Sequence, residues 1–84
     1  MDNVVAAPRL TRAGILFSVT VDYRQYLCLV PAATLAILSH SKDPKLDLLI
    51  TYCAFRTKIE GVARRVINAG VAGVPVVVSS IYFH

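Results

Sequence analysis

Hydrophobic residues gather in three short segments of this 84-residue chain that are typical of β-strands. Ile15–Val21 (ILFSVTV) is rich in β-branched and aromatic residues, and Tyr26–Val30 (YLCLV) is predicted to be the returning strand. The polar segment between them, Asp22–Gln25 (DYRQ), predicts a turn, so the two strands form a hairpin. Val76–Phe83 (VVVSSIYF) is predicted to be the last strand, and its valine run favours a central position with both faces covered.

The middle of the chain has the spacing of helices. Pro31 opens PAATLAILS, a short predicted helix, because proline is favoured at the first helical position. His40–Pro44 then breaks the pattern. We expect one long helix to follow, with Asp43 as its N-cap, Pro44 in its first turn and Gly70 at its end. Its apolar residues step by three and four along one face: Leu48, Tyr52, Phe55, Ile59, Val62 and Val66.

These elements predict an α+β domain with the order β-β-α-α-β. The hairpin and the C-terminal strand would form a small antiparallel sheet packed on the one long helix, whose apolar face would cover one face of the sheet. Residues 1–13 are expected to be a flexible lead-in, because Pro8 interrupts any regular element there. Residues 14–84 would form the single domain that a chain of this length can support.

Four segments carry a resemblance to a known family. In chain order they are ILFSVTV, YLCLVPAATLAIL, AFRTKIEGVARRVINAG and VVVSSIYF, and together they resemble a bacterial family of small proteins, domain-of-unknown-function family 1488. The chain departs from the family pattern at Val30-Pro31, where a serine-like cap often begins the short helix, and at Tyr82, where an acidic residue is common. The resemblance implies this small fold and a bacterial cytoplasmic setting. It transfers no catalytic residue, because the family has no established activity.

The composition indicates more apolar surface than one small core can bury. Hydrophobic residues make up 56% of the chain and charged residues 17%, against about 45–50% and about 25% in ordinary soluble domains. We therefore expect a homodimer. Its contact surface would be an exposed sheet face or the edge of the last strand, where Val76, Val78 and Ile81 are the candidate self-association residues.

The net charge of +4 and the isoelectric point near 9.4 raise a second hypothesis. Phe55–Arg65 (FRTKIEGVARR) holds four cations in one predicted helix: Arg56, Lys58, Arg64 and Arg65. An ordinary solvated helix face explains most of them, since Glu60 can pair with Arg64 and cations suit a helix C-terminus. The alternative function is a nucleic-acid-associated regulator, in which these four residues contact phosphates.

A third hypothesis, a small thiol or hydrolytic enzyme, has the least support in the sequence. Ser39, His40, Ser41 and Asp43 are close in sequence, but no nucleophile elbow precedes either serine. Cys28 alternates with leucines and Cys53 lies in a helix, so both are expected to be buried free thiols. The sparse carboxylates and histidines match no acid/base pair or metal site.

We therefore expect no catalytic residue, no cofactor and no metal. The two uncharged stretches of the chain, Gln25–Ser41 and Val66–Phe83, are interrupted by proline, glycine or polar residues, and a membrane span needs about 20 mostly apolar residues. The first twelve residues also lack the pattern of a signal peptide. The sequence thus favours a non-enzymatic, cytoplasmic interaction module without a membrane segment.

Overall fold

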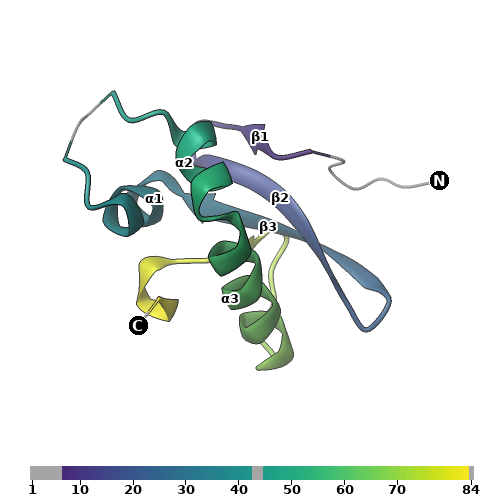
Figure 1. Ribbon diagram of the computed structural model, residues 1–84. Helices are drawn as coiled ribbons and strands as arrows, with labels where there is room; N and C mark the ends of the chain where they lie inside the picture. The colour runs from purple at the N-terminus through teal and green to yellow at the C-terminus, as the bar shows by residue number, and fades with distance from the viewer. Residues whose placement is uncertain (1–6, 43–44, 84) are drawn as a thin grey trace.

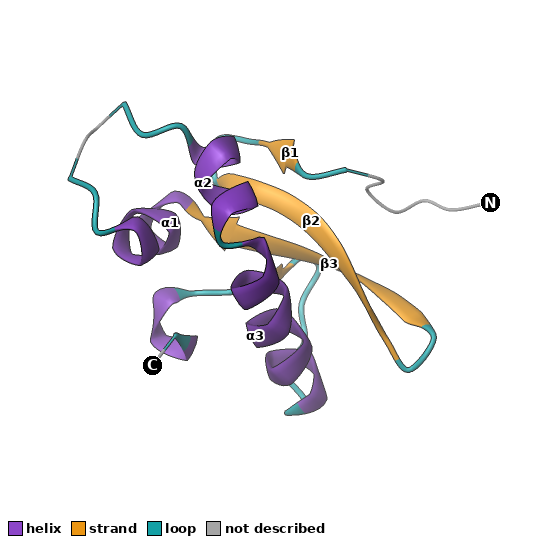
Figure 2. Ribbon diagram, viewed as in Figure 1, coloured by secondary structure: helices purple, strands orange, loops and turns teal. Residues whose placement is uncertain are grey.

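The chain folds as a four-stranded sheet with helices across one of its faces (Figure 1). The computed structural model describes residues 7–42 and 45–83. Figure 2 shows α2 and α3 crossing β2 and β3 on the same side of the sheet. The sheet order is β1-β2-β3-β4, which confirms a small α+β domain. The strands are β1 (Arg9–Leu10), β2 (Gly14–Val21), β3 (Arg24–Pro31) and β4 (Val76–Val77); the helices are α1 (Ala32–Ser39), α2 (Leu48–Ala54), α3 (Arg56–Asn68) and the 3-10 helix η1 (Ser80–Tyr82).

The β2–β3 hairpin is confirmed, but its turn is tighter than the predicted four residues. Val21 pairs with Arg24, so only Asp22 and Tyr23 connect the strands. Their φ angles are 51° and 65°. Positive φ at both central residues is the type I′ geometry, whose twist matches that of the flanking strands. Aspartate tolerates this conformation, which explains how the turn forms without the usual Asn-Gly pair.

The prediction of an antiparallel sheet is wrong for the last strand. β4 covers Val76–Val77 rather than Val76–Phe83, and it pairs in parallel with β3, so the sheet is mixed. The reason is the long connection from β3 to β4: a chain that crosses a sheet face in helices returns in the parallel direction. The residues after Val78 turn away into η1. A further strand, β1, lies in the segment expected to be an irregular lead-in and pairs with β2.

The prediction of a single long helix is also wrong, because the structure divides this segment into two helices at Phe55. The backbone of Phe55 has φ −111° and ψ 16°, which is outside the helical region, and it separates α2 from α3. Asp47, rather than Asp43, caps α2, and its side chain accepts a hydrogen bond from the Ile50 N–H at 2.9 Å. Asp43 and Pro44 lie outside the described residues. The apolar stripe runs through both segments, because periodicity encodes which face is buried and not whether the axis is continuous.

The core lies between this stripe and one face of the sheet. Alternate residues of β2 are buried, from Ile15 to Val21, and they meet the buried stripe of α3. Tyr52 of α2 is fully buried, with its ring centroid 5.3 Å from that of Phe17. Gly70 ends the α3 segment as predicted: it has φ 94°, and its N–H donates to the Ile67 carbonyl at 3.0 Å. Among the described residues, no helix is both long enough and apolar enough to cross a bilayer.

Candidate functional site

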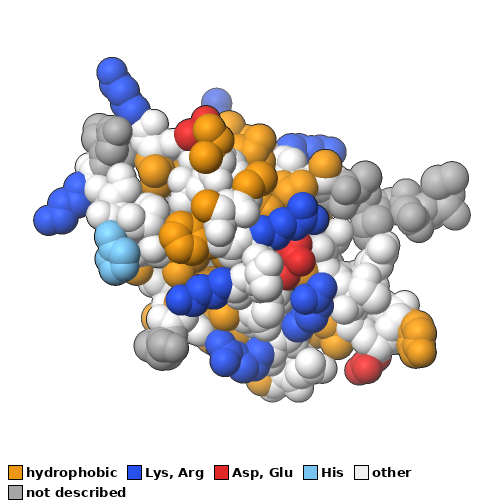
Figure 3. All heavy atoms as spheres, in the orientation of Figure 1, with side chains coloured by type: hydrophobic (Ala, Val, Ile, Leu, Met, Phe, Trp, Pro, Cys, Tyr) orange, Lys and Arg blue, Asp and Glu red, His pale blue; other side chains and the backbone are white. Residues whose placement is uncertain are grey.

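The four cations proposed to contact phosphate are all exposed on α3, and Figure 3 shows Lys and Arg side chains gathered over this part of the surface. With 3.6 residues per turn, they divide between two flanks of the helix. Arg56 and Arg64 lie on one flank with Glu60 between them, whereas Lys58 and Arg65 lie on the other. The structure therefore brings the four residues onto one helix, but not into one continuous row.

Glu60 partly neutralises the first flank. Its Oε2 accepts a hydrogen bond from Arg56 Nε at 2.9 Å, and its Oε1 lies 3.9 Å from Arg64 Nη2. The hydrogen bond to Glu60, followed by its charge, raises the pKa of Arg56. The predicted Glu60–Arg64 pair is thus present, but the Arg56 contact is shorter. Three charged side chains carry a net charge of only +1 on this flank, which weakens it as a phosphate contact.

The same carboxylate also contacts the core. The hydroxyl of Tyr52 donates to Glu60 Oε2 at 3.2 Å, across the break between α2 and α3. Burial, and then the negative charge of Glu60, raises the pKa of the Tyr52 phenol. Glu60 therefore serves packing as well as charge balance, since a buried hydroxyl needs a partner.

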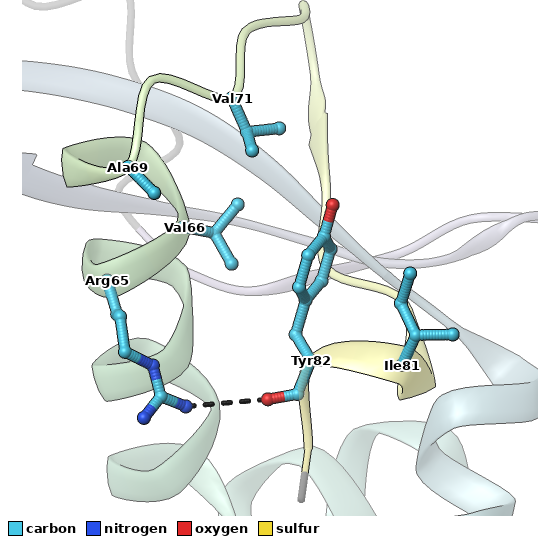
Figure 4. Close-up of a pocket in the computed structure, with 6 residues that line it drawn as sticks. All are labelled: Arg65, Val66, Ala69, Val71, Ile81 and Tyr82. Atoms are coloured by element: carbon cyan, nitrogen blue, oxygen red, sulfur yellow. Dashed lines mark hydrogen bonds between the residues drawn. The ribbon is translucent and has the colours of Figure 1, made fainter.

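Arg65 occupies a different setting, at the edge of an apolar groove (Figure 4). Its Nη2 donates to the Tyr82 carbonyl at 3.4 Å, which joins α3 to η1. Figure 4 shows the Tyr82 ring lying alongside Val66, with the phenol pointing away from Arg65. The groove has a volume of about 300 Å³ and is lined by Arg65, Val66, Ala69, Val71, Ile81 and Tyr82.

Sequence reasoning does not find this groove. The helix pattern places Arg65 on a solvated face, and the strand pattern places Ile81 and Tyr82 in a strand. The groove forms because η1 turns back toward α3 and α1, a tertiary arrangement that leaves no periodic signal in the sequence. Its one local clue is the end of α3, where the Val71 N–H donates to the Val66 carbonyl at 3.2 Å and brings these two lining residues together.

The proposed self-association residues do not share one surface. Val76 and Val78 are buried in the core of the monomer, whereas Ile81 is 64% exposed and lines the groove. Buried valine side chains cannot meet a partner, so contact at β4 would involve its backbone edge rather than Val76 and Val78. Among the described strands β4 pairs with β3 alone and lies at an edge of the sheet, so the central position predicted for the last strand is wrong.

The sheet face opposite the helices is a second apolar surface. Leu16 pairs with Leu29, and Leu29 pairs with Val77, so these three side chains project from the same face. Leu27, two residues from Leu29, projects from that face as well. This face is the one that does not carry the buried residues Ile15 and Phe17. Val77 is 45% exposed, and the three leucines are partly exposed. We call Leu16, Leu27, Leu29 and Val77 the open-face patch.

The candidate chemical groups have ordinary surroundings. Cys28 is buried, and burial raises the pKa of its thiol from the ordinary 9.0 to about 11, the opposite of the shift that activates a nucleophile. Cys53 is exposed, so the expectation that it is buried is wrong. Its side chain lies off the apolar face of α2 that buries Tyr52.

Ser39 donates to the Ala36 carbonyl at 3.2 Å as part of α1. Within residues 7–42 and 45–83, no three histidine, cysteine or acidic side chains are grouped to hold a metal ion.

The fold and these surfaces define a small α+β domain with a mixed sheet, helices on one face and an apolar patch on the other. Residues 8–74 match the model of the family described as protein of unknown function DUF1488, and the chain belongs to this family. This confirms the resemblance seen in the sequence. The match ends before β4 and η1, so Ile81 and Tyr82 lie outside it. No curated protein and no solved structure matches the chain.

Proposed function

We propose that this protein is a non-enzymatic interaction module that self-associates as a homodimer through the open-face patch. The observation that carries the proposal is the position of Leu16, Leu29 and Val77 across three neighbouring strands, on the face that no helix of the described chain covers. An apolar patch of this kind on a small domain is typical of a protein contact.

A second copy is the partner that this surface suits best. The four patch residues are uncharged, and Arg9 of β1, which pairs with Leu16 and so projects from the same face, lies at the edge of the patch. Two copies can bring their uncharged centres together about a two-fold axis if the two Arg9 side chains stay at the border of the interface. The same face becomes polar toward the hairpin end, at Ser18, Thr20 and Gln25, which would give the apolar centre a hydrophilic border. Two such sheets would pack about 10 Å apart with interdigitating side chains.

The size of the patch sets the expected strength of the dimer. A strand residue rises about 3.4 Å and neighbouring strands lie about 4.8 Å apart, so the whole face, with its polar border, offers about 400 Å² per copy, of which the four patch residues cover about a third. Stable interfaces usually bury about 800 Å² per partner. The expected dimer is therefore weak, with a dissociation constant in the micromolar range.

Sedimentation equilibrium over a range of concentrations tests the proposal. The wild-type chain should form dimers, whereas Leu16→Glu and Leu29→Glu should stay monomeric while keeping the wild-type circular dichroism spectrum. Ile37→Glu is the matched control, because Ile37 is an exposed large hydrophobic residue on α1, outside the patch. A wild-type monomer at high micromolar concentration overturns the proposal, and so does a dimer that survives both patch substitutions.

The same samples distinguish the proposal from a nucleic-acid-associated regulator. Short duplex DNA should remain free at moderate salt, because Glu60 neutralises part of the basic face of α3. A DNA-bound species that dissociates steeply as salt rises would instead support phosphate contacts by Arg56, Lys58, Arg64 and Arg65. Arg64→Glu combined with Arg65→Glu would then abolish that species.

We also propose that the protein acts in the bacterial cytoplasm. Its two cysteines are free, one buried and one exposed, which suits a reducing compartment. Thiol titration of protein purified from cells under anaerobic conditions should give two free thiols per chain after denaturation. An intermolecular disulfide through Cys53 in such a sample would contradict this assignment.

A further inference from the structure

We propose that the groove between α3 and η1 binds a small amphiphilic carboxylate, with the apolar part in the groove and the carboxylate on Arg65. This inference concerns the helical side of the molecule and is independent of self-association through the sheet. It is based on the lining of the groove, on the charge at its edge and on the lack of a counter-ion for Arg65 in the described chain.

The lining suits an apolar group. Five of the six lining residues are aliphatic or aromatic, and Ile81 among them is 64% exposed. A large aliphatic side chain exposed beside a concave apolar surface is unfavourable in water, and a ligand that covers both removes that apolar area from water. The volume of about 300 Å³ is at the lower end for ligand sites, so it suits a short acyl chain or a single ring rather than a nucleotide cofactor.

The charge at the edge favours an anion. Arg65 makes one long hydrogen bond, 3.4 Å to the Tyr82 carbonyl, although a guanidinium has five N–H donors. Among the described residues that line the groove, none carries a carboxylate. In the described part of the chain, Glu60 is the carboxylate that pairs with arginines of α3, and its partners are Arg56 and Arg64. Arg65 thus keeps donors and an unbalanced positive charge at the groove.

The arrangement favours a carboxylate over a phosphate. One guanidinium can hold a carboxylate through two parallel hydrogen bonds, whereas a phosphate dianion requires further donors or charges. Lys58, the other cation on this flank, lies seven residues away, which is about 10 Å along the helix axis. A monoanion therefore matches the one charge among the described lining residues, that of Arg65.

Three probes separate the apolar contact in the groove from the carboxylate contact with Arg65: octanoate, octanol and acetate. Titrations are followed by amide chemical shifts of the full chain, below the micelle concentration of octanoate. Octanoate should shift the amides of the lining residues in a saturable manner. Octanol lacks the charge and acetate lacks the chain, so each should bind at least tenfold more weakly. Equal binding of octanol and octanoate would overturn the role of Arg65, and no saturable shift with octanoate would overturn the site.

Substitutions test the two contacts separately. Arg65→Gln should weaken octanoate binding at least tenfold, whereas Arg64→Gln, one residue away and directed toward Glu60, should leave it unchanged. Ala69→Leu should block the groove, and it should fold normally because Ala69 is exposed at the helix end. Unchanged binding by Arg65→Gln and Ala69→Leu contradicts the proposal. The same titration of Leu16→Glu should match wild type, which separates this inference from dimerisation.

Discussion

The hydroxyl of Tyr52 lies 3.2 Å from Oε2 of Glu60, and this contact joins α2 to α3 across the break at Phe55. The Tyr52 ring is at the same time buried against Phe17 of β2. One side chain therefore connects both helices with the sheet. The hydroxyl and the ring can be tested apart, because phenylalanine keeps the ring and removes only the donor.

Tyr52→Phe should lower the free energy of unfolding by about 0.5–1.5 kcal/mol, the usual net value of one hydrogen bond. The packing against Phe17 should persist, and so should the Arg56–Glu60 pair. Urea denaturation followed by circular dichroism gives the value. Tyr23→Phe is the matched control, since Tyr23 is fully exposed in the hairpin turn; an equal loss in both variants would contradict the role given to the Tyr52 hydroxyl.

Stability should fall at alkaline pH because of Cys28. Burial raises the pKa of its thiol from 9.0 to about 11, so between these values the folded protein keeps a proton that the unfolded chain has lost. Deprotonation of Cys28 therefore favours unfolding. The thiol's contribution to the free energy of unfolding is fully present below about pH 9 and is lost as the pH rises through about 11. Tyr52, whose pKa is also raised, adds to the fall.

Denaturation at a series of pH values above neutrality measures this loss. Cys28→Ala should show a shallower decline than wild type, whatever its stability at neutral pH. Cys53→Ala should follow the wild-type decline, because Cys53 is exposed. If Cys28→Ala and wild type decline in parallel, the buried thiol is not the titrating group.

The two cysteines should differ in their reaction with an aromatic disulfide reagent. Cys53 should react rapidly in the native protein, and Cys28 only when the protein unfolds, because the attacking thiolate must be formed and accessible. The absorbance of the released aromatic thiol should show that one thiol per chain reacts rapidly in the native protein. The second thiol should react only after denaturant is added. Cys53→Ser should remove the fast equivalent; two fast equivalents in the native wild type would show that β3 opens readily.

The same substitution should have opposite effects at two glycines. Gly61 lies on the exposed side of α3, and a Cβ at this position would point into open space, so Gly61→Ala should stabilise the protein by about 0.5–1 kcal/mol. Gly14 has φ 145°, and a Cβ there would overlap the backbone of Val30 and Pro31. Gly14→Ala should cost about 1–3 kcal/mol from backbone strain alone, and the overlap with the backbone of Val30 and Pro31 should add to this loss.

Thermal and urea denaturation of both variants give these values. A loss of stability in Gly61→Ala would show that the helix has a neighbour at that position, such as the partner subunit of a dimer. Measuring Gly61→Ala at low and at high protein concentration separates an effect within the monomer from one at an interface.

The sequence by itself determined the elements whose residues contact near neighbours. The hairpin follows from the β-branched run before Asp22 and the apolar return Tyr26–Val30, and the end of α3 follows from Gly70. The buried stripe from Tyr52 to Val66 follows from spacing by three and four, because burial of one face imposes that period whether or not the helix is continuous.

Only the tertiary structure decided the features that depend on distant segments. The direction of β4 depends on how three helices cross the sheet, and the break at Phe55 depends on how α2 and α3 fit over β2. Helix spacing places Glu60 four residues from both Arg56 and Arg64, but its contact with the buried Tyr52 depends on how α2 meets α3. The groove at Arg65 and the open-face patch depend on which surfaces the other elements leave uncovered. Local sequence patterns do not predict which surfaces stay uncovered.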